Sequence, residues 1–176
     1  MKIQIANGRV IDPANQIDAR QDVFIAEGKI VALGAAPAGF VANKVIDAKG
    51  LIVAPGLVDL SARLREPGFE YRATLESEMQ AAMAGGITSL ACPPDTRPPL
   101  DEPELVERLV RRSESIGLAR VFPVGALTQQ LAGEKLSEMV GLSRAGCIAF
   151  SQATKPIFDT QVAAAFLGER QQISYG

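Results

Sequence analysis

The sequence predicts an α/β protein with two parts, a small β-rich region followed by part of a parallel (β/α) barrel. In residues 1–55, short alternating segments are separated by turn signals such as Asn7-Gly8, a pattern typical of a small antiparallel sheet. After Pro55-Gly56, four strand-like segments alternate with helical ones, which is typical of parallel βαβ units. About 120 residues follow Gly56, whereas a closed eight-stranded barrel takes ~250. We therefore expect about four βα units and an incomplete barrel chain.

The first region is expected to contain two hairpins, one turning at Asn7-Gly8 and one at Glu27-Gly28-Lys29. Two further short β segments surround the turn at residues 47–50. The expected strands are residues 2–6, 9–11, 22–26, 30–33, 45–46 and 51–53.

In the second region the helices are bounded by recognisable capping residues. Asp101 is expected to cap a helix that has Pro103 in its first turn and Glu104 at the capping-box position. Gly85-Gly86 ends an earlier helix and therefore does not form a phosphate-binding turn. The expected strands are residues 57–64, 87–92, 120–124 and 147–150, and the expected helices are residues 74–84, 101–115, 136–142 and one starting at 159.

Composition excludes several classes of function. The chain carries 18 Lys and Arg against 20 Asp and Glu with no basic run, which argues against nucleic-acid binding. No apolar run approaches the ~18 residues of a membrane span. Cys92 and Cys147 do not make a disulfide framework, so we expect a cytoplasmic protein. The chain contains no histidine, which removes the commonest metal ligand and the usual general base.

One run of sequence is far more specific than the rest. It reads Ala54-Pro-Gly-Leu-Val-Asp-Leu-Ser-Ala-Arg-Leu-Arg-Glu-Pro-Gly-Phe-Glu-Tyr and ends at Tyr71. It resembles the first barrel strand of dihydroorotases in the amidohydrolase superfamily. The segments Gly85-Gly86-Ile87-Thr88, Pro94-Asp95-Thr96 and Ile148-Ala149-Phe150-Ser151 resemble the same family. The resemblance implies a small β-sandwich domain over residues 1–55, to which residues 173–176 return, and a metal-dependent-hydrolase barrel over residues 56–172.

The positions that hold metal in active members of that family carry unsuitable residues here. The family places two histidines on the first strand in an Asp-x-His-x-His pattern, where this chain has Asp59 followed by Ser61 and Arg63. Ser61 is a poor zinc ligand, and Arg63 brings a permanent positive charge. On the fourth strand, Gln152 stands where the family has a metal-bridging aspartate, and an amide cannot supply that anion. The resemblance therefore implies a lost zinc site, no cofactor and no catalytic residue.

Two positions that bind substrate in the family are partly retained. Arg65 stands where an arginine holds the substrate carboxylate, and Asp95 stands in place of an asparagine. An anion at Asp95 would repel the anionic substrates of the family. Alternatively, Asp95 pairs with Arg63 or Arg65 and fills the pocket with an ion pair.

Several of these residues also have a purely structural interpretation. Arg63 and Arg65 alternate along the expected strand and would share its solvent face. Glu66-Pro67-Gly68 is a turn-forming sequence in either account. The remaining assignments are Cys92 and Cys147 in the core, Asp159 as a helix N-cap and Lys155 in an exposed loop.

The resemblance implies a non-catalytic dihydroorotase-like subunit of pyrimidine biosynthesis that assembles with the aspartate carbamoyltransferase catalytic chain in a homo- and hetero-oligomer. One alternative is an active cyclic-amide hydrolase with an atypical metal site, or a metal-free one using Asp59, Asp95 and Lys155. Another is a pyrimidine-precursor binding protein that uses Arg65 without metal. The resemblance weakens after about Gln161. This predicts either that the central half of a longer protein is missing and its last residues are joined on, or that the chain is truncated.

Overall fold

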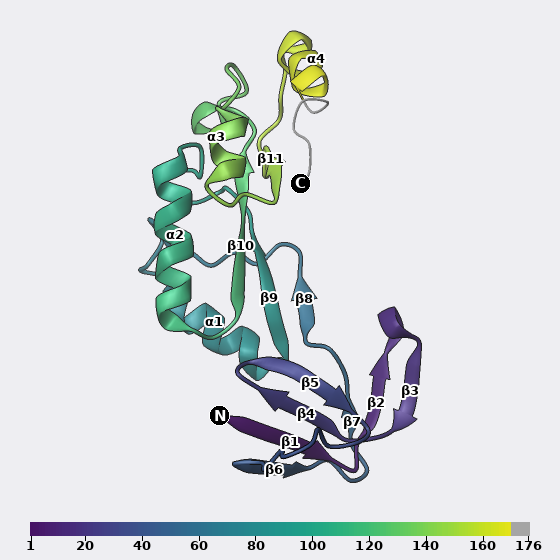
Figure 1. Ribbon diagram of the computed structural model, residues 1–176. Helices are drawn as coiled ribbons and strands as arrows, with labels where there is room; N and C mark the ends of the chain where they lie inside the picture. Colours follow the sequence, from purple (N-terminus) through teal and green to yellow (C-terminus); the bar gives the residue numbers. More distant parts are fainter. Residues whose placement is uncertain (170–176) are drawn as a thin grey trace. The chain divides into compact units, whose positions relative to one another are not determined.

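The computed structural model describes residues 1–169 and divides the chain into two compact units, Met1–Pro55 and a second one that starts at Gly56 (Figure 1). Each unit is described by itself. The expected return of residues 173–176 to the first unit lies outside the described residues. No helix of the described part is both long enough and apolar enough to cross a membrane.

The first unit consists of seven short strands in two sheets. One sheet has the order β5-β4-β1-β6 and the other has the order β3-β2-β7. The elements are β1 (Lys2–Ala6), β2 (Arg9–Asp12), η1 (Pro13–Asn15), β3 (Ile17–Arg20), β4 (Val23–Ala26), β5 (Lys29–Leu33), β6 (Lys44–Asp47) and β7 (Ile52–Val53).

The expected hairpin at Asn7-Gly8 is wrong, because β1 and β2 belong to different sheets. β1 pairs antiparallel with β4 and parallel with β6, whereas β2 pairs with β3 and β7. Asn7 has a positive φ of 66°, and its side chain donates to Asp47 while its backbone N–H donates to Asp22. These bonds fix Asn7 at the point where the chain passes from one sheet to the other. The expectation of a single antiparallel sheet is also wrong. The unit has two sheets, and each contains one parallel pair of strands.

The second hairpin is confirmed. β4 and β5 pair antiparallel across a turn in which Glu27 and Gly28 both have positive φ, at 53° and 73°. Positive φ at both central residues is the geometry that matches the right-handed twist of the two strands.

Over residues 56–169 of the second unit, four parallel strands alternate with helices, as the sequence predicts. The strand order is β11-β10-β9-β8, and the sheet curls as half of a (β/α) barrel. The elements are β8 (Leu57–Asp59), α1 (Leu75–Ala84), β9 (Ile87–Cys92), α2 (Pro103–Ile116), β10 (Arg120–Ala126), η2 (Gln129–Leu131), α3 (Met139–Arg144), β11 (Ala149–Ser151) and α4 (Thr160–Glu169).

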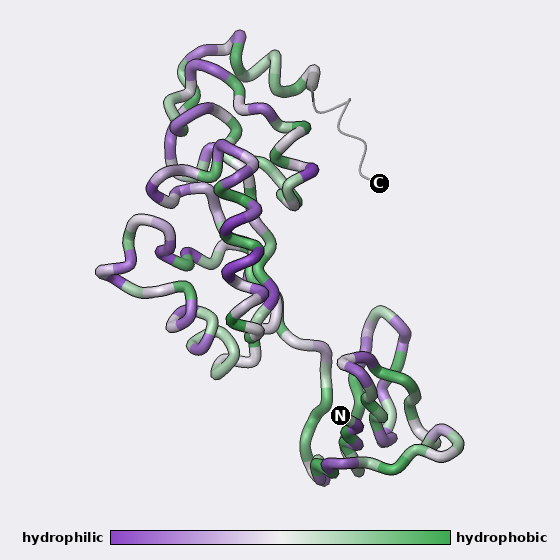
Figure 2. Tube along the Cα trace, turned by 60° about the vertical axis from the view of Figure 1, so that its left-hand side comes forward, coloured by the Kyte–Doolittle hydropathy of each residue, from purple (hydrophilic) through white to green (hydrophobic). Residues whose placement is uncertain are grey.

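The core of this unit lies between the sheet and the helices α1, α2 and α3 (Figure 1). Leu75 and Met79 of α1 and Val106 of α2 are fully buried there. Figure 2 shows hydrophilic and hydrophobic residues alternating along α2, which buries one face and exposes the other. Burial of this amphipathic face, more than helix propensity, holds α2 in place.

Several expected boundaries of the second unit are wrong. Asp101 does not cap α2, and Glu104 completes no capping box; the N-cap is Glu102, which makes no side-chain capping bond. Asp101 is buried instead, and its carboxylate accepts from the backbone N–H and the side-chain amide of Gln130. The expected helix over residues 136–142 begins only at Met139, because Leu136 pairs with Thr128 in an isolated β-bridge.

Candidate functional site

The first strand of the half-barrel is much shorter than expected. β8 ends at Asp59, whose carboxylate accepts the backbone N–H of Ser61 at 2.8 Å and turns the chain. Ala62 then donates to the carbonyl oxygen of Ala91 at 2.9 Å. Arg63 and Arg65 consequently lie beyond the strand, and Arg65 has a positive φ of 65°. The expectation that both arginines share one strand face is wrong.

Arg63 and Asp95 form the central ion pair of the site. Arg63 Nε donates to Asp95 Oδ2 at 2.8 Å, and the side chains are 40% and 28% exposed. The hydrogen bond to Asp95, reinforced by its charge, raises the pKa of Arg63 above its ordinary value. The predicted pairing of Asp95 with one of the two arginines is confirmed for Arg63. Within residues 1–169, Arg65 has no carboxylate partner within 4 Å.

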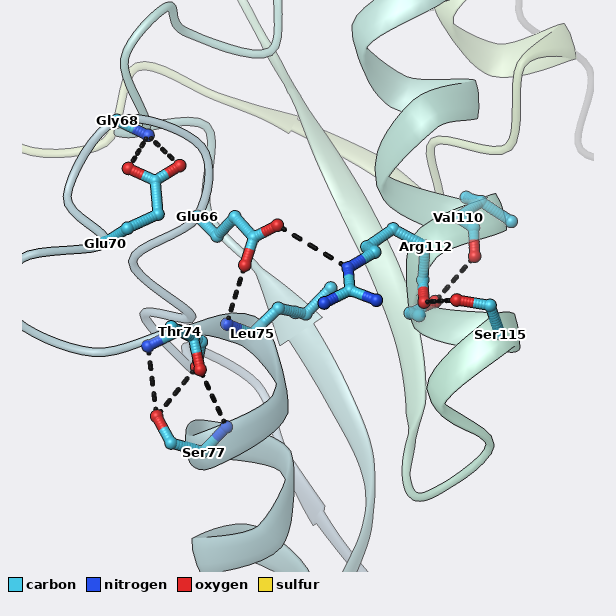
Figure 3. A network of polar contacts seen from close by, with 10 residues as sticks. Glu66, Gly68, Glu70, Thr74, Leu75, Ser77, Val110, Arg112 and Ser115 are labelled. Atoms are coloured by element: carbon cyan, nitrogen blue, oxygen red, sulfur yellow. Dashed lines mark hydrogen bonds and ion pairs between the residues drawn. The ribbon is translucent and has the colours of Figure 1, made fainter.

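The loop that carries Arg65 is fastened by residues that the sequence did not single out for this role (Figure 3). Glu66 accepts the backbone N–H of Leu75, the first residue of α1, at 3.0 Å, and its other oxygen lies 3.7 Å from Arg112 Nε on α2. A carboxylate at a helix N-terminus is favourable because free N–H groups point at it. One side chain therefore ties the loop to two helices.

Gly68 in the same loop has a steric role. Its φ is +96°, and a Cβ there would overlap the backbone carbonyl of Arg97. Its N–H donates to both carboxylate oxygens of Glu70 at 2.9 Å, which lowers the pKa of Glu70 (Figure 3). The turn predicted for Glu66-Pro67-Gly68 is confirmed.

Gln152 directly follows β11 and is held by a buried threonine. Thr128 donates its hydroxyl to Gln152 Oε1 at 2.9 Å and accepts the backbone N–H of Gly133 at 2.9 Å. Thr128 is completely buried. Gln152 Nε2 is also buried and finds no hydrogen-bond partner among the described residues. The side-chain oxygen of Gln152 is thus already engaged by the protein itself.

These side chains do not fit the divalent metal that the resemblance implies. Ser61 offers an exposed neutral hydroxyl, Arg63 is a cation already paired with Asp95, and the oxygen of Gln152 accepts from Thr128. In the described part of the chain, no group of three or more His, Cys, Asp or Glu residues is placed to hold a metal ion. We therefore derive no chemical step through a metal here.

The remaining candidates are structural. Cys92 and Cys147 are buried free thiols, and burial raises the pKa of each to about 12, as expected for core cysteines. Lys155 is exposed in the loop after β11. Asp159 accepts the backbone N–H of Gln161 at 2.7 Å at the start of α4, which confirms its predicted capping role.

Two solved structures share the fold of most of this chain. L-Hydantoinase (dihydropyrimidinase) from Arthrobacter aurescens covers 89% of this chain and 35% of its own, with a TM-score of 0.71 and 22% identity. N-acyl-D-glutamate deacylase from Bordetella bronchiseptica covers 96% of this chain and 43% of its own, with a TM-score of 0.62 and 17% identity. The fold is that of the amidohydrolase barrel proteins.

Sequence comparison is more specific. Residues 50–165 match the dihydro-orotase-like family. A dihydroorotase-like protein of Pseudomonas aeruginosa is 55% identical over 151 residues, and a dihydroorotase of Pelobacter propionicus is 43% identical over 165 residues. These matches cover 86% and 92% of this chain but 36% and 38% of the relatives. The chain belongs to the dihydroorotase-like family and spans little more than a third of the length of these relatives.

Proposed function

We propose that this chain is a non-catalytic dihydroorotase-like subunit of pyrimidine biosynthesis that assembles with aspartate carbamoyltransferase. In this proposal the barrel region acts through its surface. The strand ends that hold catalytic residues in the family hold none in this chain. A barrel fold tolerates this loss because packing holds the fold while function resides in loops and strand ends.

The ion pair between Arg63 and Asp95 carries the proposal. By resemblance, Arg63 stands at a metal-ligand position and Asp95 at a substrate-binding position of the family. Here the two side chains bind each other at 2.8 Å. A guanidinium has no lone pair to offer a metal ion, and the Asp95 carboxylate is already occupied by Arg63 and so is not free to bind a ligand. The same contact therefore opposes both the cofactor and the substrate of the active relatives.

Gln152 supports the proposal independently. It lies on a different strand end, and its amide oxygen accepts from Thr128 at 2.9 Å. An amide lacks the negative charge that a bridging ligand needs, and rotating it toward a metal would leave a buried hydroxyl without its acceptor. Substitution of Arg63 alone would consequently not rebuild a metal site.

Ligand binding without turnover is a weaker alternative. The depression lined by Arg63, Arg65, Asp95 and Thr96 has a volume of about 10 Å³, which is room for one water molecule. A pyrimidine precursor needs a pocket many times larger. The alternative of a metal-free hydrolase is weakened because Asp59 caps a backbone turn and Asp95 is already paired.

The test is to mix the purified chain with aspartate carbamoyltransferase from the same organism and to record native mass and transferase activity. We expect a stoichiometric complex with transferase activity gained or stabilised against dilution. An active dihydroorotase from an unrelated organism, added at the same concentration, serves as the control. Two separate species with unchanged transferase activity would contradict the proposed partner.

A further inference from the structure

A pocket lies between the first residue of α1, the loop that precedes it and the exposed side of α2. Its volume is about 220 Å³, and its walls come from residues within the range 66–112. Arg63 and Asp95 do not line it, so it is distinct from the site described above. Pockets for drug-sized ligands typically have volumes of ~300–1,000 Å³. This pocket therefore suits a smaller molecule.

One side of the pocket is apolar and is fixed by the core behind it. Leu75 of α1 is fully buried, and Leu109 of α2 is 4% exposed. Both belong to the hydrophobic core of the second unit, against which the partly buried Leu105 also packs. An apolar group placed against these side chains would be removed from water, which is favourable in proportion to the area buried.

The other side of the pocket is positively charged. Arg108 and Arg112 stand one turn apart on α2, and both line the pocket. Arg112 is shared with Glu66, whose carboxylate lies 3.7 Å from its Nε and also accepts from the backbone of Leu75 (Figure 3). Arg108 has no carboxylate within 4 Å among residues 1–169. Two arginines and one glutamate leave a net charge of about +1 at the pocket.

We propose that this pocket binds a small monocarboxylate. Its carboxylate contacts the guanidinium groups of Arg108 and Arg112, and its apolar body packs against Leu75 and Leu109. A guanidinium presents paired N–H donors that match the two oxygens of a carboxylate. A single negative charge balances the pocket, whereas a phosphate dianion would exceed its charge and would lose hydration against the apolar side.

The test measures binding of hexanoate to the full chain by isothermal titration calorimetry at constant ionic strength. We expect saturable binding at one site per chain. Hexanamide keeps the apolar body without the charge, and acetate keeps the charge without the body. Each should bind about tenfold more weakly than hexanoate, because each lacks one of the two contacts. Inorganic phosphate should also bind more weakly than hexanoate.

A pair of variants on α2 locates the site. Arg108→Gln removes the unpaired guanidinium and should weaken hexanoate binding about tenfold. Arg111→Gln is the matched control, because Arg111 pairs with Glu107, is 69% exposed and does not line the pocket. It should leave the affinity for hexanoate unchanged. Circular dichroism checks that both variants are folded.

Absence of saturable hexanoate binding would overturn the proposal, and so would equal binding of hexanamide, acetate or phosphate. Equal weakening by Arg108→Gln and Arg111→Gln would show that the anion does not bind in this pocket and would overturn it as well. These measurements need no transferase, so their result is independent of the proposed partner.

Discussion

Arg63 and Asp95 form a short ion pair between two side chains that both remain in contact with water. Exposed ion pairs contribute little to stability because water screens the attraction and both side chains lose freedom. In the proposed function, the importance of this pair lies in the metal and substrate that it excludes from the site. Its contribution to folding and its effect on the chemistry of the site can be measured separately.

We predict a coupling free energy of at most about 1 kcal/mol between Arg63 and Asp95. The measurement is a double-mutant cycle with Arg63→Ala, Asp95→Ala and the double variant, followed by urea unfolding. The coupling should shrink further in high salt. A coupling of several kcal/mol that is insensitive to salt would mean that the pair is desolvated and holds the fold together.

Thr128 is expected to matter more for stability than the ion pair. Thr128→Val removes the donor to Gln152 and the acceptor for Gly133 at a fully buried position. Leaving buried polar groups unpaired costs about 1–3 kcal/mol, which urea unfolding would detect. Thr154→Val, at an exposed site, is the matched control and should stay within about 0.5 kcal/mol. Equal effects of the two substitutions would contradict the assigned network.

The two cysteines give a prediction for pH dependence. Burial raises the pKa of Cys92 and Cys147 to about 12 from an ordinary value of 9.0, so the unfolded chain ionises first as pH rises. The contribution of the two protonated thiols to the free energy of unfolding is therefore fully present below pH 9. It is lost progressively between pH 9 and about 12. At pH 8 the folded chain should resist iodoacetamide while the urea-unfolded chain reacts at both thiols. Rapid labelling of the folded chain would show that the thiols are accessible.

At the scale of single elements, α1 has a well-defined start. Thr74 accepts the backbone N–H of Ser77, and the Ser77 hydroxyl lies 3.0 Å from the backbone nitrogen of Thr74, which completes a capping box (Figure 3). Glu66 adds a third bond, to Leu75. In the first turn of α1, the backbone N–H groups of Leu75 and Ser77 therefore both have side-chain acceptors.

Thr74→Ala should destabilise the second unit by about 0.5–2 kcal/mol, since it leaves the backbone N–H of Ser77 without its acceptor. Ser115→Ala near the end of α2 is the control, because the Ser115 hydroxyl is exposed and bonds only to the carbonyl of Arg112. Amide hydrogen exchange in α1 reads out the effect locally. Unchanged protection of the Ser77 amide in Thr74→Ala would contradict the capping role.

Elements with a strong periodic pattern and a clear stop signal were predictable from the sequence. Residues 87–92 form β9 as expected, and α1 ends before Gly85-Gly86 as expected. Asn7-Gly8 misled because a turn signal does not specify which strands pair. Asn7 is bonded to Asp22 and Asp47, both distant in sequence, and those contacts decide the path of the chain.

The site was predictable in its residues and less so in its geometry. Opposite charges at family site positions predicted that Asp95 pairs with Arg63 or Arg65, and the structure decides for Arg63. The early end of β8 depends on a local bond between Asp59 and Ser61, which an alternating pattern over residues 57–64 conceals. The roles of Glu66 and Thr128 depend on contacts with Arg112 and Gln152, each more than twenty residues away, and no local pattern indicates such contacts.

At the scale of the whole molecule, the described chain combines two small sheets with half of a parallel barrel whose edges are open. Its family relationship is clear, and Ser61, Arg63 and Gln152 stand where the resemblance places the metal ligands of the family. We propose that this barrel region takes part in pyrimidine biosynthesis through its surface and without a metal-dependent reaction of its own.

The most direct test of this claim is zinc content, measured by mass spectrometry after equilibration with zinc and removal of the free ion, together with dihydroorotate hydrolysis by the same sample. We predict well below one zinc per chain and no hydrolysis above the background without protein. Arg63→Ala should not restore either property, because Ser61 and Gln152 remain poor ligands. Near-stoichiometric zinc with measurable turnover in the unaltered chain would contradict the proposed loss of the metal site.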